Sequence, residues 1–277
     1  MKKIDIHVHI GKVLFSRSGI SVRYLLNWMD KMEIEKACVM AVENPEEIDY
    51  YVTTERVIRS CRLHPDRLIP FCNVDPRRGN PGEFDPYPII ARYVDRGACG
   101  FGEMLSGLMI DDRRNMKLFE ACGKLDIPVL IHMDNYRNRD EIGLPRLERV
   151  LQTFPNVTFI THALHWWSEI SADVINKDRG TYPKRPIVRG GRVEELLHKH
   201  ENLFADLSAD SGTNALTRDP SFTPGFLMRN QDKLLFGTDL VYKGQLKTIH
   251  EVLDSSGVDT AVLKKIYYLN AKRVLGL

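Results

Sequence analysis

The sequence predicts a (β/α)8 barrel, and three observations lead to this fold class. Short β-branched runs alternate with amphipathic stretches from one end of the chain to the other. Eight strand–helix units of this kind are typical of a parallel sheet that closes into a barrel. The length of 277 residues suits one such barrel. A doubly wound sheet is the alternative, but no Gly-x-Gly-x-x-Gly follows the first expected strand.

The expected elements alternate regularly along the chain. The eight expected strands are short aliphatic runs at residues 3–9, 37–42, 68–74, 98–104, 128–133, 157–162, 203–208 and 234–239. The expected helices follow the strands one by one, at residues 22–32, 46–63, 87–96, 113–125, 144–153, 192–200, 221–230 and 246–255. A last helix, at residues 259–269, would lie outside the eight units and cap the barrel.

The composition indicates a well-packed domain. Hydrophobic residues make up 43% of the chain, charged residues 27%, and the formal net charge is +2. No apolar run approaches the roughly 20 residues of a membrane span, and so small a charge does not favour a nucleic-acid or membrane partner. No repeat or Pro/Gly/Ser-rich linker divides the sequence. We therefore expect one domain covering residues 1–277, with a small-molecule substrate; homo-oligomer formation is left open.

The N-terminus and the cysteines indicate a cytoplasmic protein. The chain begins Met-Lys-Lys and lacks the apolar core of a signal peptide. The cysteines are odd in number, dispersed and without a Cys-x-x-Cys pair: Cys38, Cys61, Cys72, Cys99 and Cys122. A disulfide framework or a zinc ribbon would space them differently. We expect reduced thiols in the core of the protein.

Two histidines mark the first expected strand. His7 and His9 lie two residues apart, so their side chains point to the same face of the strand. Asp5 shares this parity, whereas the even-numbered aliphatic residues of the strand are expected to face the helices. Two imidazoles a few ångströms apart on a rigid strand can bind one metal ion.

Ionisable side chains also end four other expected strands. Glu103, His132, His162 and Asp239 each lie at the C-terminal end of a strand. In barrels of this type that rim carries the active site, and an apolar strand has no structural need for a carboxylate or imidazole there. Together with the two histidines of the first strand, these side chains match the N/O ligands of a zinc-like ion. The sequence therefore predicts a site for one or two divalent ions, with zinc as the first choice.

The ordered set of motifs resembles the amidohydrolase superfamily. The Asp-x-His-x-His motif at residues 5–9, His132 on the fifth strand, His162 on the sixth and the Phe-Gly-Thr-Asp motif ending at Asp239 are similar to its amidohydrolase-related branch, also called amidohydrolase 2. That branch also ends in a segment similar to residues 270–277. The resemblance covers nearly the whole chain, and it implies a metal-dependent TIM-barrel enzyme.

The resemblance also implies roles for individual residues. The metal ligands of the family correspond to His7, His9, His132 and Asp239. His162 corresponds to a residue that is either a ligand of a second metal ion or a proton shuttle.

Glu103 departs from part of the family. Many two-metal members carry a carbamylated lysine or a glutamate on the fourth strand as a bridge between the ions, and Glu103 stands at that position. The decarboxylases of the related branch usually lack this carboxylate and use one metal ion. Glu103 therefore favours a hydrolase with two metal positions.

The expected reaction is hydrolysis of an amide, lactone or other ester bond. A bound metal lowers the pKa of a coordinated water from about 16 towards roughly 7 and polarises the scissile group. Asp239 is the first candidate to move the proton from this water to the leaving group, and His162 is the second. The alternative is metal-dependent, non-oxidative decarboxylation of an unsaturated or aromatic carboxylic acid. A barrel that binds a metal or ligand without turnover is a further alternative.

Several residues outside this set remain candidates for supporting roles. The longest connection, residues 163–191, contains two tryptophans and a basic stretch, and it is either a binding loop or a solvated surface loop. Within it, His165 is a candidate to line the substrate pocket. Asp206 and Ser208 end the seventh expected strand, where they can orient a ligand or contact the substrate.

Overall fold

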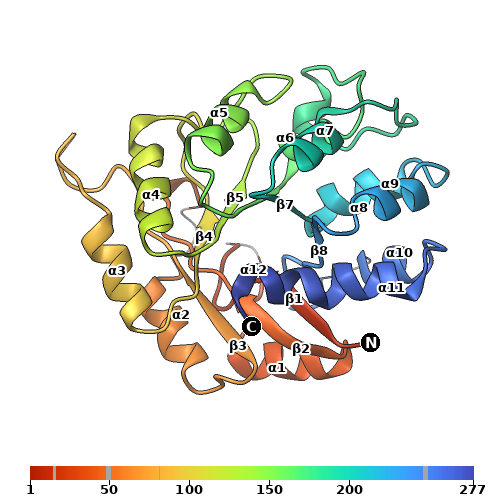
Figure 1. Ribbon diagram of the computed structural model, residues 1–277. Helices are drawn as coiled ribbons and strands as arrows, with labels where there is room; N and C mark the ends of the chain where they lie inside the picture. Colours follow the sequence, from red (N-terminus) through yellow and green to blue (C-terminus); the bar gives the residue numbers. More distant parts are fainter. Residues whose placement is uncertain (15–16, 48–50, 81, 246–248) are drawn as a thin grey trace.

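The computed structural model has the predicted (β/α)8 architecture. It describes residues 1–14, 17–47, 51–80, 82–245 and 249–277. The eight strands form one sheet in the order β1-β2-β3-β4-β5-β6-β7-β8, and the helices surround them (Figure 1). Hydrogen bonds from the Ile6 N–H to the Phe236 carbonyl (2.9 Å) and from the His9 N–H to the Leu240 carbonyl (3.0 Å) join the eighth strand to the first. The sheet therefore closes into a barrel.

All neighbouring strands pair in parallel, so their carboxyl ends share one rim. The strands are β1 Lys3–Val8, β2 Ile34–Val39, β3 Leu68–Cys72, β4 Gly100–Met104, β5 Val129–His132, β6 Phe159–His162, β7 Leu203–Asp206 and β8 Leu234–Leu235. The second strand begins three residues before its expected start. The eighth is shorter than expected and ends at Leu235, because the Phe236 N–H donates to the Ile266 carbonyl (3.0 Å) instead of to a neighbouring strand.

Eight helices correspond to the expected ones, with shifted ends. They are α1 Val22–Lys31, α2 Thr54–Cys61, α3 Tyr87–Asp95, α4 Arg113–Lys124, α5 Pro145–Thr153, α7 Arg192–Lys199, α9 Thr223–Arg229 and α10 Ile249–Asp254. The sequence did not predict α6 Leu164–Ser168, α8 Ala209–Thr217 or the short 3-10 turns at Pro45–Glu47 and Asp178–Gly180.

The prediction of one helix over residues 46–63 is wrong in its first part. Residues 48–50 lie outside the described residues, but Val52 forms a bridge with Val42 and is therefore extended. The helix α2 starts only at Thr54, where the Thr53 side chain accepts a hydrogen bond from the Arg56 N–H and caps the helix. The expected start of the helix at residues 246–255 also lies outside the described residues.

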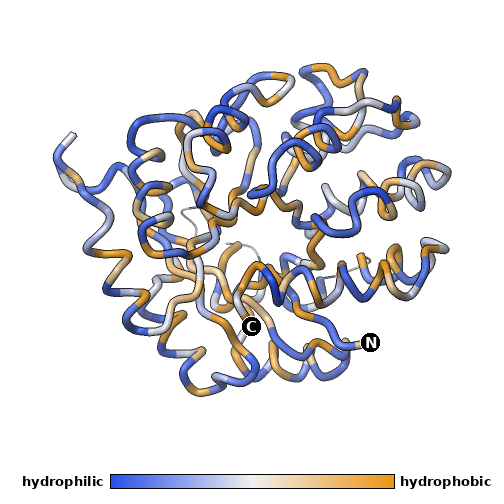
Figure 2. The backbone as a smooth tube through the Cα atoms, viewed as in Figure 1, coloured by the Kyte–Doolittle hydropathy of each residue, from blue (hydrophilic) through white to orange (hydrophobic). Residues whose placement is uncertain are grey.

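The interior of the barrel holds its own apolar group. Its members alternate along the strands: Ile4, Ile6, Cys38, Met40, Ile69, Phe71, Leu130, Ile160, Phe204 and Leu235, together with Ala271. A larger group fills the space between the strands and the helices. Figure 2 shows mainly hydrophobic residues on the inner strands and alternating character on the outer helices. This pattern is expected for a sheet that is buried on both faces.

The first strand departs from the simple alternation that the sequence suggests. Ile4 and Ile6 were expected to face the helices, but both belong to the inner apolar group. The reason is an irregularity in the pairing of β1 with β2, where the register shifts between Asp5 and Val8. Beyond this shift, Val8 packs with the outer group, and the two histidines point into the rim of the barrel.

The C-terminal segment closes the opposite end of the barrel. The expected last helix is in fact three consecutive pieces: α11 Thr260–Lys264, a π-helical turn at Lys265–Leu269 and α12 Asn270–Leu275. Asn270 donates a hydrogen bond to the carbonyl of Leu234, at the start of β8 (2.8 Å). Ala271 packs into the inner apolar group. The segment therefore caps the barrel as expected, although it extends beyond the expected boundary.

Two further observations bear on the expectations from composition. No helix within the described ranges is both long enough and apolar enough to cross a membrane. All five cysteines are free; four of them are buried as expected, whereas Cys99 is exposed.

Candidate metal centre

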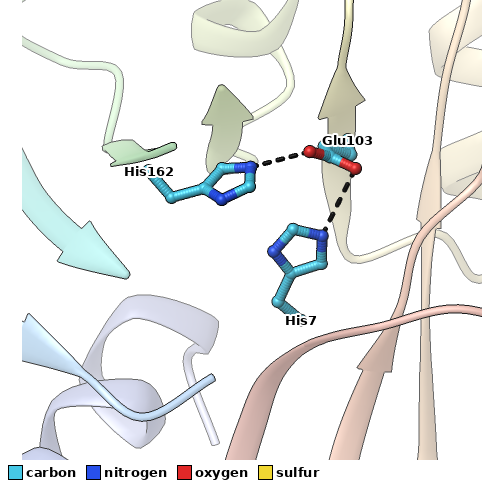
Figure 3. Close-up of side chains that lie close together, drawn as sticks. All are labelled: His7, Glu103 and His162. Atoms are coloured by element: carbon cyan, nitrogen blue, oxygen red, sulfur yellow. Dashed lines mark hydrogen bonds and ion pairs between the residues drawn. The ribbon is translucent and has the colours of Figure 1, made fainter. Parts of the chain in front are cut away.

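The six ionisable residues singled out in the sequence lie together at the carboxyl rim of the barrel. They come from five strand ends: His7 and His9 from the first, Glu103 from the fourth, His132 from the fifth, His162 from the sixth and Asp239 from the eighth. Figure 3 shows Glu103 between His7 and His162, with a different carboxylate oxygen turned towards each imidazole.

One part of this cluster, which we call the His7 group, comprises His7, His9, Asp239 and one oxygen of Glu103. The Nε2 atoms of His7 and His9 lie 3.1 Å apart. Asp239 Oδ1 lies 3.7 Å and 3.3 Å from these two nitrogens, and Glu103 Oε2 lies 3.4 Å and 3.3 Å from them. Ligand atoms about 2.0–2.2 Å from one shared ion lie roughly 3.0–3.6 Å apart. The donor atoms and their spacing therefore fit a divalent metal ion.

The other part, the His132 group, comprises His132, His162 and the second oxygen of Glu103. Glu103 Oε1 lies 2.8 Å from His132 Nδ1 and 2.7 Å from His162 Nε2. These are hydrogen-bond distances, shorter than the spacing in the His7 group. Glu103 thus connects the two groups through its two different oxygens, as a carboxylate that bridges two ions would.

Asp5 ties the first strand to the end of the last. Its Oδ1 accepts hydrogen bonds from the backbone N–H groups of His7 and Thr238, both at 3.0 Å, and its Oδ2 accepts one from the Thr238 hydroxyl at 2.7 Å. The Asp239 N–H in turn donates to the His7 carbonyl (2.8 Å). Burial raises the pKa of Asp5 to about 7. Asp5 therefore holds the two strand ends that carry the His7 group.

A buried carboxylate stands behind His7. Asp206 Oδ2 lies 2.9 Å from His7 Nδ1, and Asp206 also accepts hydrogen bonds from the Ser208 N–H (2.9 Å) and hydroxyl (2.6 Å). All three residues are fully buried. Gly237 makes room for this arrangement, because a Cβ there would lie 2.2 Å from Asp206 Oδ1. Asp206 and Ser208, suggested by the sequence as orienting residues, thus contact His7 directly.

A second carboxylate, which sequence reasoning missed, stands behind His132. Asp134 Oδ2 lies 2.9 Å from His132 Nε2, and it also accepts a hydrogen bond from Arg137 Nη1 at 2.6 Å. Asp134 follows His132 by two residues, so strand parity could have indicated it. The pKa of Asp134 is lowered, because its bonds and charge interactions with these two residues outweigh its burial.

The carboxylates and imidazoles of the cluster shift one another's pKa. Burial alone would raise the pKa of Glu103, but the charge of His7 and hydrogen bonds from His132 and His162 hold this pKa well below its usual value. Burial would lower the pKa of His132, yet its hydrogen bonds with Asp134 and Glu103 raise it to about 9. Without a bound ion, protons on His7, His9 and His132 therefore compensate the carboxylates, whereas burial lowers the pKa of His162.

This protonation predicts that metal binding depends on pH. A metal ligand must lose its proton, and His132 holds its proton up to about pH 9. Protons therefore compete with the metal, and affinity should rise from pH 6.5 to pH 8.5 by up to about tenfold per pH unit for each proton displaced. Titration calorimetry in two buffers of different ionisation enthalpy should detect proton release on binding. Equal affinity at both pH values would contradict this assignment of charge.

The connection after β6 is partly packed against the site. Its two tryptophans are buried, and the Trp167 indole N–H donates to the Asp206 carbonyl at 3.1 Å. His165 Nε2 lies 2.7 Å from Asn135 Oδ1, and Arg179 Nη2 donates to His165 Nδ1 at 2.9 Å. Burial, together with the charge of Arg179, lowers the pKa of His165 to about 3. Residues 163–171 of the connection are therefore packed into the protein, whereas most residues from 172 to 190 are exposed, as a solvated loop would be.

One cavity, of about 570 Å³, has a lining residue that is hydrogen-bonded to the backbone of Asp239. It is lined by Arg17, Ser18, Asp210, Tyr242, Lys243, Gly244 and Gln245. The Gln245 side-chain amide donates to the Asp239 carbonyl at 3.2 Å, so the cavity adjoins the His7 group.

Comparisons with solved structures agree with the fold. A TIM-barrel protein from Bordetella bronchiseptica described as uncharacterised has a TM-score of 0.70 at 16% identity, over 100% of this chain and 99% of the other. A probable 2-pyrone-4,6-dicarboxylic acid hydrolase from Acinetobacter baumannii, with citric acid bound, has a TM-score of 0.65 at 11% identity, over 100% of both chains. A dihydroxybenzoic acid decarboxylase from Polaromonas, with manganese and the inhibitor 2-nitroresorcinol, has a TM-score of 0.62 at 16% identity, over 100% and 97%.

At these identities the structural likeness establishes the fold and not the reaction. A comparison with curated proteins found no match. The sequence does match a family model, that of the amidohydrolases, over residues 4–277. The match includes every strand end that contributes to the metal centre. The chain therefore belongs to the amidohydrolase family, as its motifs suggested.

Proposed function

We propose that this protein is a hydrolase that binds two divalent metal ions, one in the His7 group and one in the His132 group. The observation that carries this proposal is the position of Glu103. One of its oxygens lies 3.3–3.4 Å from the nitrogens of His7 and His9, and the other lies within 2.8 Å of those of His132 and His162. The alternative one-metal decarboxylase needs no carboxylate at this place.

The protein's own residues divide the work of hydrolysis. When bound, the metal supplies Lewis acidity, which polarises the scissile carbonyl and acidifies water. Asp239 is the candidate to accept a proton from that water, because its side chain is 22% exposed, whereas those of His7 and His9 are buried. His162 is less suited to this step, because its Nε2 contacts Glu103 and its side chain is 1% exposed.

The types of ligand atom suggest the metal, and the descriptions of similar structures suggest the substrate class. Four imidazoles together with carboxylates favour zinc, while the similar decarboxylase structure contains manganese. The similar structures are described as acting on or binding carboxylated ring compounds. Carboxylated lactones are therefore the first substrates to test, and dihydroxybenzoates are the corresponding test of decarboxylation.

The decisive measurement is the number of metal ions per chain. We expect two ions in the wild-type protein and hydrolysis of a member of the lactone, ester and amide panel. Glu103→Gln should bind one ion, because an amide offers only one oxygen as a ligand, and this loss should be seen by elemental analysis. Two ions in Glu103→Gln would contradict the bridging role. A wild-type protein that saturates at one ion and releases carbon dioxide from dihydroxybenzoates would establish the alternative.

A further inference from the structure

The two halves of the metal centre differ in what stands behind their imidazoles. Behind His7, the Asp206 carboxylate accepts hydrogen bonds from Ser208 but, within the described part of the chain, forms an ion pair with His7 alone. Behind His132, the Asp134 carboxylate forms an ion pair with Arg137. The negative charge behind His7 is therefore not balanced by a second cation, whereas that behind His132 is.

The ligands of the His7 group also carry more negative charge than those of the His132 group. Asp239 belongs to the His7 group, and Glu103 is shared between the two groups. The His7 group thus has the carboxylates of Asp239 and Asp206 in addition to the shared one. Among the described residues, Asp134 is the carboxylate that pairs with His132 in addition to the shared one, and the guanidinium of Arg137 offsets its charge. In a buried site, where charges are poorly screened, a divalent ion strongly favours the more negative position.

The spacing of the ligand atoms adds a third difference. In the His7 group they already lie 3.1–3.7 Å apart, which is the spacing that ligands of one ion adopt. In the His132 group the contacts of Glu103 Oε1 are hydrogen bonds of 2.7–2.8 Å. An ion entering the His132 group must separate these atoms, whereas the His7 group is preformed.

We propose that the two positions fill in a fixed order, the His7 group first and tightly, the His132 group second and more weakly, and that Asp206 sets this difference. This inference rests on the proposed two-metal function. A carboxylate behind an imidazole holds its Nδ1 proton, directs the Nε2 lone pair at the ion and makes the imidazole a stronger ligand. Asp206 is therefore a positioning residue, acting on the metal through His7.

The test is a titration of the metal-free protein with Mn²⁺, with free Mn²⁺ measured by electron paramagnetic resonance. The wild-type protein should bind two ions in steps separated by at least about tenfold in Kd. Asp206→Asn should weaken the first step by about 10–100-fold, the usual effect of losing such a carboxylate. The matched variant Asp134→Asn removes the carboxylate behind His132, and it should weaken the second step while leaving the first within about threefold.

A second variant covers the case in which Asp206→Asn fails to fold, as judged by circular dichroism. Gly237→Ala keeps the carboxylate but places a methyl group 2.2 Å from the present position of Asp206 Oδ1, so the carboxylate must leave its position behind His7. It should also weaken the first step. Equal affinities of the two steps in the wild-type protein, or an unchanged first step in the folded variants, would overturn this proposal alone. A wild-type protein that saturates at a single ion would overturn the proposed two-metal function together with it. A wild-type protein that binds no ion would overturn the proposed function as well.

Discussion

Replacement of Asp239 by asparagine should leave substantial metal bound and remove most turnover. The neighbouring imidazoles of His7 and His9, with Glu103, still offer three ligands to an ion in the His7 group. The amide of asparagine can offer an oxygen to the metal, but it cannot accept a proton near neutral pH. General acid–base catalysis contributes about 10²- to 10⁴-fold, so kcat should fall by that factor. The loss should appear in kcat more than in KM.

The control for this variant lies at the other end of the same strand. Asp232→Asn also removes a carboxylate, but Asp232 precedes β8 at the amino end of the barrel, where it pairs with Lys265, whereas Asp239 lies beyond the carboxyl end of that strand. Its kcat should stay within a few-fold of the wild-type value. Steady-state kinetics with elemental analysis of both variants would decide the matter. A near-normal kcat in metal-loaded Asp239→Asn would move the role of proton acceptor to His162.

Replacement of His7 by alanine should have the largest effect on metal content. His7 is the one histidine whose contacts reach His9, Glu103, Asp239 and the Asp206 carboxylate. Its loss removes a ligand and leaves the buried charge of Asp206 without its partner. We therefore expect metal affinity of the His7 group to fall by more than about 100-fold, the upper end of the effect of losing a supporting residue alone. Turnover should fall to that of the metal-free protein.

His198→Ala provides the comparison for this variant. His198 is exposed on α7 and takes no part in the cluster, so its replacement should leave metal content unchanged. Elemental analysis after dialysis against a weak chelator would measure both variants. Full metal retention in His7→Ala would contradict the assignment of the metal centre.

Much of the site followed from local rules of sequence. A strand has a side-chain period of two, and the carboxyl ends of parallel strands share one rim. These rules placed Glu103, His132, His162 and Asp239 together although up to 136 positions separate them along the chain. The metal assignment itself, the location in the cytoplasm and the state of assembly stay predictions.

The errors lie where distant contacts decide the local structure. The register shift in β1 depends on pairing with β2, and it turned Ile4 and Ile6 inward. The bridge between Val42 and Val52 kept extended a segment that local pattern assigned to a helix. The contact of Asp206 with His7 joins residues 199 positions apart, so no short motif could show it.

Because α12 closes one end of the barrel, it restricts the route by which a substrate can reach the site. Ala271 packs into the apolar interior, and Asn270 is hydrogen-bonded to the start of β8, so the barrel is closed at its amino end. A substrate that reaches the candidate metal centre must enter from the rim, and its product must leave from the same side. Substrate and product therefore pass through the same opening at the carboxyl rim. We therefore expect a product that dissociates slowly to delay the binding of the next substrate.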